Sequence, residues 1–169
     1  LVNDDKRNAL IIADILSMVA EQRHPIVLTE RREHAQLLGD LLSQQGIRFQ
    51  LLRGAMNAKE RDRVMAALDD TQVIVATGKY IGEGFDLPKL DTLFLVLPIS
   101  WKGSLAQYVG RIQRQFEGKE KVIVFDYLDA SLPMLQRMYQ KRAKGYAAMG
   151  YTITEKADEL LQANLDLDR

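Results

Sequence analysis

The sequence has no cysteine among its 169 residues, which excludes a disulfide framework and any metal site built on thiolates. A reducing, cytoplasmic location is expected on the same ground. No apolar stretch approaches the length of a membrane span and no signal-like segment opens the chain, so a membrane is not an expected partner. The chain begins with Leu1 rather than Met, and we therefore expect it to be a piece of a longer protein.

The sequence also lacks an excess of charge of either sign, with 23 basic and 23 acidic residues. Bulk electrostatics therefore does not indicate nucleic-acid binding, although a local basic face needs only a few Lys or Arg side chains. His24 and His34 are isolated from acids at ligand spacing, so we interpret both as surface or packing residues and expect no metal site.

Two phosphate-binding motifs are missing. The loop G-x-x-x-x-G-K-[S/T] does not occur, and its superficial echo at 76–80 has Tyr80 where a hydroxyl residue would hold magnesium. No acidic box of the DEAD or DEAH kind follows an apolar strand, so nothing in this chain positions a metal or activates an attacking water. A G-x-G-x-x-G turn is absent between Pro25 and Gly39, which argues against a small-molecule enzyme of flavodoxin-like or Rossmann-like architecture.

What is present is a regular alternation of short apolar strands with helical patterns, the pattern of a βαβ-wound parallel sheet. At 47% apolar residues the chain can build one proper core. We predict one domain over 1–150, followed over 151–169 by a short extended segment and a polar helical tail. The predicted helices are 5–22, 32–45, 57–68, 104–114 and 131–149, and the predicted strands are 26–29, 48–52, 72–76, 91–97 and 122–126.

Local signals mark several of these boundaries. The first helix is predicted to carry Leu10 in its apolar pattern, and the second to bury Leu41. Gly46 lies where a left-handed helix C-cap belongs. Asn57 with Glu60 three residues later predicts an N-cap followed by a helix.

The most informative segment is the run from Gln107 to Arg114. On a helix, Gln107, Arg111 and Arg114 fall on one face at i, i+4 and i+7. Guanidinium groups present a fixed fork of donors and keep their charge, which suits an anionic oxygen cluster such as a triphosphate. The alternative is a solvated Arg/Gln face with surface ion pairs, and the absence of acids over 102–115 weakens it.

Three segments in this order resemble the second RecA-like domain of superfamily 2 helicases and translocases. Val27–Glu30 resembles motif IV of that family, Val73–Pro88 motif V, and Gln107–Arg114 motif VI in its Q-x-x-G-R-x-x-R form. The resemblance covers roughly 6–149, and the run 110–127 is most similar to restriction-enzyme motor subunits and excision-repair-type translocases. It implies a three-layer α/β/α domain of the P-loop NTPase type with a mainly parallel central sheet.

The resemblance implies roles at an ATP site. Arg114 corresponds to the arginine finger on the γ-phosphate, Arg111 to a second phosphate contact, and Gln107 to polar support beside them. Asp86 corresponds to a residue that faces the ribose or orders the arginines, and Gly84 permits a tight turn beside the ligand. ATP with magnesium is the implied cofactor, with the magnesium held by a preceding RecA-like domain that this chain lacks.

The resemblance also implies a nucleic-acid grip. Thr77 offers a hydroxyl and an N–H group to a phosphate, and Lys79 adds a nearby charge. Thr29 and Arg31 lie at a strand-to-helix junction, and Arg53–Gly54 lies where this fold makes another backbone contact. The alternative for the last two places is an ordinary cap or turn.

The function predicted on these grounds is the C-terminal lobe of a nucleic-acid-dependent ATPase, a helicase or translocase, inactive alone because it lacks the preceding RecA-like domain. DNA is favoured over RNA as the partner, and the isolated domain is expected to be monomeric. The alternative is a non-catalytic module that uses the same fold to bind nucleic acid or protein.

Overall fold

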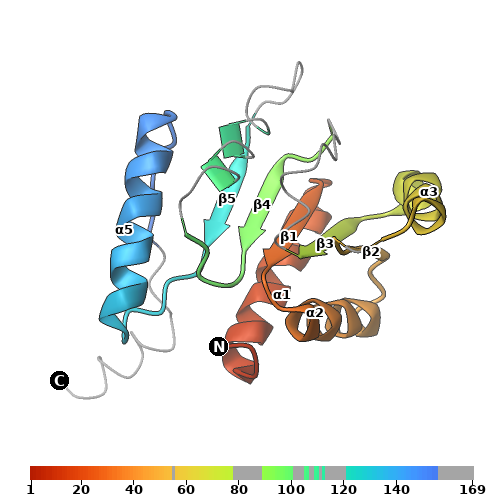
Figure 1. Ribbon diagram of the computed structural model, residues 1–169, viewed down its shortest axis with the longest axis horizontal. Coiled ribbons are helices and arrows are strands. Elements are labelled where there is room, and N and C mark those ends of the chain that lie inside the picture. The colour runs from red at the N-terminus through yellow and green to blue at the C-terminus, as the bar shows by residue number, and fades with distance from the viewer. Residues whose placement is uncertain are drawn as a thin grey trace.

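A central sheet with helices packed around it forms the body of the protein in the computed structural model (Figure 1). The structure describes residues 1–54, 56–77, 89–100, 105–106, 109–110, 112 and 121–155, and the statements below concern these residues. In the view of Figure 1, α5 stands beside β5 at one end of the sheet and α3 lies beyond β2 at the other end.

The elements alternate along the chain as the apolar pattern predicts. Their bounds are α1 Asp5–Ala20, β1 Pro25–Thr29, α2 Arg32–Gln44, β2 Phe49–Leu52, α3 Ala58–Ala67, the short 3-10 helix η1 Leu68–Asp70, β3 Val73–Thr77, β4 Thr92–Leu95, β5 Ile123–Asp126 and α5 Pro133–Ala148. Among the helices in the described ranges, none has both the length and the apolar content to cross a membrane.

The five strands form one sheet in the order β2-β3-β1-β4-β5, and every neighbouring pair is parallel. Parallel neighbours cannot be joined by a tight turn, so each strand must be followed by a crossover; α2 supplies it between β1 and β2, and α3 between β2 and β3. The expectation of a parallel sheet between two helical layers is confirmed.

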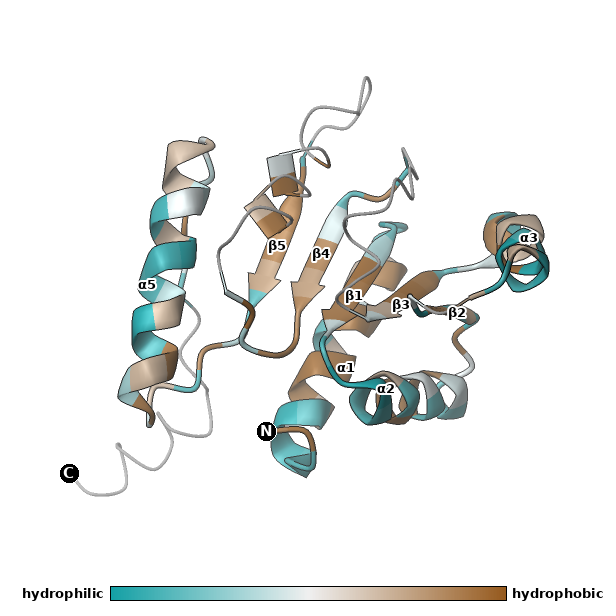
Figure 2. Ribbon diagram, viewed as in Figure 1, coloured by the Kyte–Doolittle hydropathy of each residue, from teal (hydrophilic) through white to brown (hydrophobic). Residues whose placement is uncertain are grey.

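Alternate side chains of the strands feed two separate cores, one on each face of the sheet. On one face, Val27, Val75 and Phe94 pack with buried residues of α1 and α2. On the other face, Leu28, Ala76 and Leu93 pack with residues of α3, of positions 105–112 and of α5. The strands β1, β3 and β4 are buried on both faces and are apolar apart from a threonine at one end of each, and Figure 2 shows them mainly brown.

The helix boundaries follow from local chemistry. Asp4 accepts a hydrogen bond from the backbone of Arg7 at the start of α1. The predicted capping box of α3 is present, with Asn57 and Glu60 each accepting from the other's backbone N–H. Gly46 has φ +73°, in the left-handed region that the predicted C-cap requires.

Several details of the sequence prediction are wrong, and the bounds of the described elements differ from the predicted ones by up to two residues. The first helix ends at Ala20 rather than at residue 22, because Gln22 has φ 60° and cannot continue a right-handed helix. Leu10 is 46% exposed, and Leu41 is only half-buried. In both helices the face turned to the sheet is narrower than the apolar pattern, so a leucine at its margin stays in contact with solvent.

Candidate nucleic-acid and domain-closure site at the carboxyl edge of the sheet

The carboxyl ends of all five strands meet at one edge of the sheet, the edge where open α/β sheets bind ligands. In the strand register, Thr29 at the end of β1 lies opposite Thr77 at the end of β3. Leu52 of β2 lies opposite Ala76, so Arg53 follows β2 beside the end of β3. The sheet thus brings three of the residues predicted to contact nucleic acid to neighbouring positions on one edge.

Thr29 is fully buried, and its hydroxyl belongs to a chain of hydrogen bonds beneath this edge. Its Oγ1 lies 3.3 Å from Nδ1 of His34, and Nε2 of His34 lies 3.0 Å from Oδ1 of Asn8. The amide nitrogen of Asn8 donates to the carbonyl of Val2 at 2.8 Å. Asn8, His34 and Thr29 are all nearly inaccessible to solvent. We call these three side chains the β1 relay.

The β1 relay has one consistent direction of donation. Because the Asn8 amide nitrogen donates to Val2, its Oδ1 accepts from Nε2–H of His34, and the bare Nδ1 accepts from the Thr29 hydroxyl. Burial, with smaller repulsion from Arg7 and the N-terminal ammonium, lowers the pKa of His34 to about 4. His34 is therefore a neutral packing residue, as its isolation in the sequence suggests.

Arg31 precedes α2 and is exposed at the same edge. Its backbone N–H donates to Oγ1 of Thr29 at 3.3 Å, so the β1 relay fixes the main chain at the start of this helix. The N–H groups of the first helical turn and an exposed guanidinium together favour an anion. Thr29 can contribute to an anion site here by fixing the turn before α2, because its own hydroxyl is already hydrogen-bonded to His34.

Arg53 and Gly54 follow β2 and are both exposed. A guanidinium nitrogen of Arg53 lies 3.9 Å from Oε1 of Glu60, and the two side chains are 59% and 40% exposed. An ion pair this open to solvent is worth roughly 0–1 kcal/mol, so Arg53 can exchange Glu60 for a phosphate at little cost. Thr77, on the neighbouring strand, is half-buried.

Arg7 of α1 lies at the far half of the same edge. Its guanidinium donates to the carbonyl of Val96 at 2.5 Å and to that of Tyr127 at 3.4 Å, just beyond β4 and β5. It also lies 5.8 Å from the ring centroid of Tyr127, whose hydroxyl donates to Asp14 at 2.8 Å. Burial lowers the pKa of Arg7 below its usual value. This arginine joins the two strand ends to α1.

A second group of polar side chains holds α5 against the end of β5. Arg142 donates from Nε and Nη2 to the two carboxylate oxygens of Asp126, at 2.7 and 2.9 Å. Its Nη1 donates to the carbonyl of Ile99 at 3.0 Å, and the hydroxyl of Tyr146 donates to Asp126 at 2.8 Å. The Arg142 side chain is 2% exposed and that of Asp126 9%. We call Arg142, Asp126, Tyr146 and the Ile99 carbonyl the β5 clamp.

The described positions of the predicted arginine helix are helical, and they pack into the same core as α5. Leu105, Val109 and Ile112 are all at most 5% exposed and share a cluster with Tyr146. The helix prediction is supported at these positions. The ATP-site residues predicted here and before β4, together with one nucleic-acid residue, lie outside the described part of the chain: Lys79, Gly84, Asp86, Gln107, Arg111 and Arg114.

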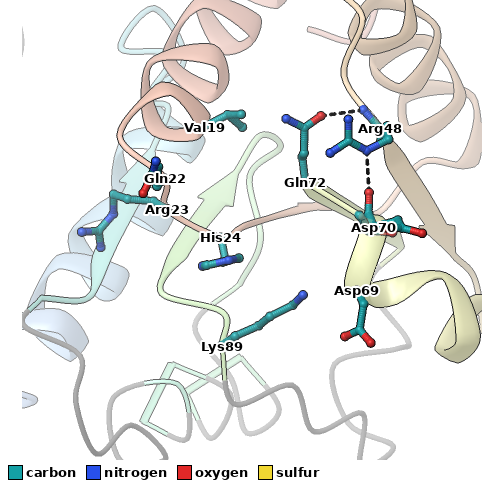
Figure 3. Close-up of a pocket in the computed structure, with 10 residues that line it drawn as sticks. Val19, Gln22, Arg23, His24, Arg48, Asp69, Asp70, Gln72 and Lys89 are labelled. Carbon is teal, nitrogen blue, oxygen red and sulfur yellow. Dashed lines mark hydrogen bonds between the residues drawn. The ribbon is translucent and has the colours of Figure 1, made fainter.

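A hollow opens at the opposite, amino edge of the sheet, between the ends of α1 and η1 (Figure 3). In Figure 3 Lys89 lies below His24 and extends toward η1, and the hollow is about 370 Å³ in volume. Its cations are already bonded: Arg48 donates to the Asp70 carbonyl and Lys89 to that of Leu68. The hollow is therefore a surface depression in which Arg48 and Lys89 are engaged by backbone carbonyls. It lies away from the carboxyl edge, where the residues predicted to contact nucleic acid lie.

The β1 relay and the β5 clamp were missed by sequence reasoning. Both join residues far apart in the chain, Asn8 with His34 and Arg142 with Ile99. No local signal marks Arg142, which lies close to Gln140, Lys141 and Lys144 in a largely polar helix. Among the residues that the structure describes, no three His, Asp or Glu side chains gather as a metal site.

Comparison with known proteins gives the family. The model of the helicase conserved C-terminal domain matches residues 6–116, more than half of the chain. UvrABC system protein B of Bifidobacterium longum is 26% identical over 144 residues, which cover 81% of this chain and 20% of that protein.

Solved structures show the same fold. T4 UvsW superposes with a TM-score of 0.69 at 18% identity, over 88% of this chain and 33% of that chain. Saccharomyces cerevisiae Dbp5, bound to RNA and ADP BeF3, superposes with a TM-score of 0.62 at 17% identity, over 93% of this chain and 40% of that chain. The chain thus spans only a fifth to two fifths of these three relatives. It belongs to the helicase conserved C-terminal domain family, and its fold is that of the second RecA-like domain of superfamily 2 helicases.

Proposed function

We propose that this chain is the C-terminal lobe of a nucleic-acid-dependent ATPase, a helicase or translocase. In this role it supplies an arginine finger and part of the grip on nucleic acid, while a preceding RecA-like domain of the same protein supplies the phosphate loop. The chain alone is then inactive as an ATPase. A cytoplasmic location and a monomeric isolated domain belong to the same proposal.

The observation that carries the proposal is the arrangement at the carboxyl edge of the sheet. The ends of β1, β2 and β3 bring the Thr29–Arg31 turn, Arg53–Gly54 and Thr77 to adjacent positions. Two exposed arginines, Arg31 and Arg53, and the N-terminus of α2 offer donors for an anion at this edge, beside the acidic Glu30 and Glu60. Such a surface suits the phosphate backbone of a strand, which is bound mainly by charge and by backbone N–H groups.

The nucleotide role rests on the sequence motif and the family. Arg111 and Arg114 lie four and seven positions after Gln107, and the described neighbours at 105, 109 and 112 are helical. ATP with magnesium, held by the preceding domain, supplies the phosphate on which the proposed finger acts. The arginines of this chain would stabilise negative charge from across the gap between the domains, and so favour the closed state of the pair.

DNA is the nucleic acid that we favour as the partner. The run 110–127 resembles restriction-enzyme motor subunits and excision-repair-type translocases, and that resemblance favours DNA for this chain. The RNA seen with Dbp5 belongs to a more distant sequence with the same fold. A non-specific grip on phosphates accepts both, so comparing turnover on duplex DNA, single-stranded DNA and RNA decides between them.

The test is Arg114→Ala in the full-length protein that carries this domain. Removal of an arginine finger costs about 10³- to 10⁵-fold in turnover in phosphoryl-transfer enzymes, and we expect a loss of about a thousandfold in kcat for nucleic-acid-stimulated ATP hydrolysis. Arg63→Ala, an exposed arginine on α3, is the matched control and should leave turnover unchanged. Undiminished hydrolysis by Arg114→Ala would contradict the finger assignment and favour the non-catalytic binding module.

A further inference from the structure

The three side chains of the β5 clamp lie beyond the segment that the family model matches, which ends at residue 116. Asp126 and Arg142 nevertheless reach back into that segment through the carbonyl of Ile99. Ile99 follows β4 and precedes the helical positions 105, 106, 109, 110 and 112 in the chain. The clamp therefore holds the main chain at the entry to the segment that carries the predicted arginines.

The geometry of the clamp fixes a direction as well as a distance. Because Nε and Nη2 of Arg142 both bond to Asp126, the planar guanidinium can neither rotate nor slide along the carboxylate. The remaining nitrogen, Nη1, then points at one place, where it meets the carbonyl of Ile99. Tyr146 bonds to the same carboxylate one helical turn later, which sets the position of α5 along β5.

The packing continues this control into the helical segment. Leu105, Val109 and Ile112 are buried in one cluster with Tyr146, against which Met149 packs. A Cβ added to Gly110 would lie 3.7 Å from the terminal methyl of Met149, so α5 and this helix are in close contact. The clamp thus holds the carbonyl of Ile99, six positions before Leu105. The end of α5 packs against the described residues of the helical segment.

The energetics favour a positioning role over a stabilising one. A buried ion pair loses much of its attraction to the cost of removing both charges from water, and an apolar replacement of similar volume is often equally stable. Burial alone would lower the pKa of Arg142, but the Asp126 carboxylate holds that pKa above its usual value. A charged pair at 2% and 9% exposure therefore adds orientation that apolar packing cannot give.

We propose that the β5 clamp is a positioning element for the arginine finger: Arg142, oriented by Asp126 and Tyr146, sets the Ile99 carbonyl and with it the helix that carries Arg111 and Arg114 in the sequence. This inference rests on the proposed function and deepens it. Arg142 acts through the helix and touches neither nucleotide nor nucleic acid.

The experiment uses the double variant Asp126→Leu with Arg142→Met in the full-length protein, which removes both charges and replaces them with apolar side chains. We expect the protein to stay folded with a lower melting temperature, because the Tyr146 hydroxyl and the Ile99 carbonyl lose their partners. The KM for ATP should stay within about twofold and kcat should fall about 10- to 100-fold, since a misplacement of about 1 Å costs on that order. Arg137→Met, an exposed arginine of the same helix, is the control and should change nothing.

A second comparison separates positioning from general damage. Arg114→Ala should cost much less in the clamp variant than in the wild type, because a displaced finger has little left to lose. Equal costs in the two backgrounds would overturn the proposal, as would a folded double variant with kcat within twofold of the wild type. If the double variant does not fold, Arg142→Lys decides by the same criteria, since lysine keeps the charge but loses the fork.

Failure of the clamp and failure of the proposed function remain distinguishable. If Arg114→Ala lowers turnover but the clamp variants do not, the finger assignment stands and the role of the clamp is contradicted. A protein indifferent to Arg114→Ala rejects both the finger and the role given to the clamp.

Discussion

The middle of the carboxyl edge, at β1, and one end of it, at β5, hold their strands in different ways. Under β1, Asn8, His34 and Thr29 form a buried relay of neutral groups, each donating to the next. At β5, Arg142 and Asp126 form a buried ion pair with Tyr146 attached. Both satisfy buried polar atoms. The neutral relay depends on the protonation of one ring, whereas the clamp depends on the presence of both charges.

The largest effect should come from removing one charge of the clamp. Asp126→Asn keeps the shape of the side chain but leaves the guanidinium of Arg142 buried without its counter-charge, and breaking a buried pair in this way costs about 3–5 kcal/mol. Urea unfolding of the chain measures the loss. Asp62→Asn, on an exposed position of α3, is the control and should change the free energy of unfolding by about 0.5 kcal/mol or less. Equal stability of the two variants would show that losing the counter-charge of Arg142 carries no cost in stability.

A smaller and pH-dependent effect is expected at the relay. The pKa of His34 is about 4 in the folded protein and about 6.5 when unfolded, so the unfolded state binds a proton first as the pH falls. The free energy of unfolding should therefore decrease between about pH 6.5 and pH 4, by on the order of 2 kcal/mol from this group. His34→Gln should flatten the profile in that window.

The matched control for the relay is His24→Gln, because His24 lies outside the relay at the opposite edge of the sheet. Its stability profile should follow that of the wild type between pH 4 and pH 6.5. If His34→Gln and the wild type lost stability in parallel over that window, the neutral relay would not be the source of the acid sensitivity.

The smallest effect on stability is expected at the exposed end of β2. Arg53→Ala removes only an ion pair open to solvent and should change the free energy of unfolding by about 0.5 kcal/mol or less. Its effect belongs to binding: affinity for nucleic acid should fall, and the slope of log affinity against log salt should decrease by about 1. Arg61→Ala on the outer side of α3 should leave the slope unchanged, and the same slope in both variants would remove Arg53 from the grip.

Local patterns predicted most of the fold. The alternation of strands and helices, the capping box at Asn57 and Glu60 and the left-handed Gly46 were all readable, because each depends on residues within a few positions of one another. Errors fell at margins, as with Leu10, where the width of a buried face depends on what covers it. The place of the arginines in the active site remains a prediction.

The sequence by itself determined the order and type of the elements, the family motifs and the absence of a phosphate loop from this chain. Only the tertiary structure decided that Thr29 lies opposite Thr77 and that the Thr29 hydroxyl bonds to His34. It also decided that Arg142 of α5 donates to the carbonyl of Ile99. The physical reason is that periodicity and capping are properties of neighbouring residues. A contact between elements depends instead on the strand register and on the height at which each helix packs, and these are set by the core as a whole.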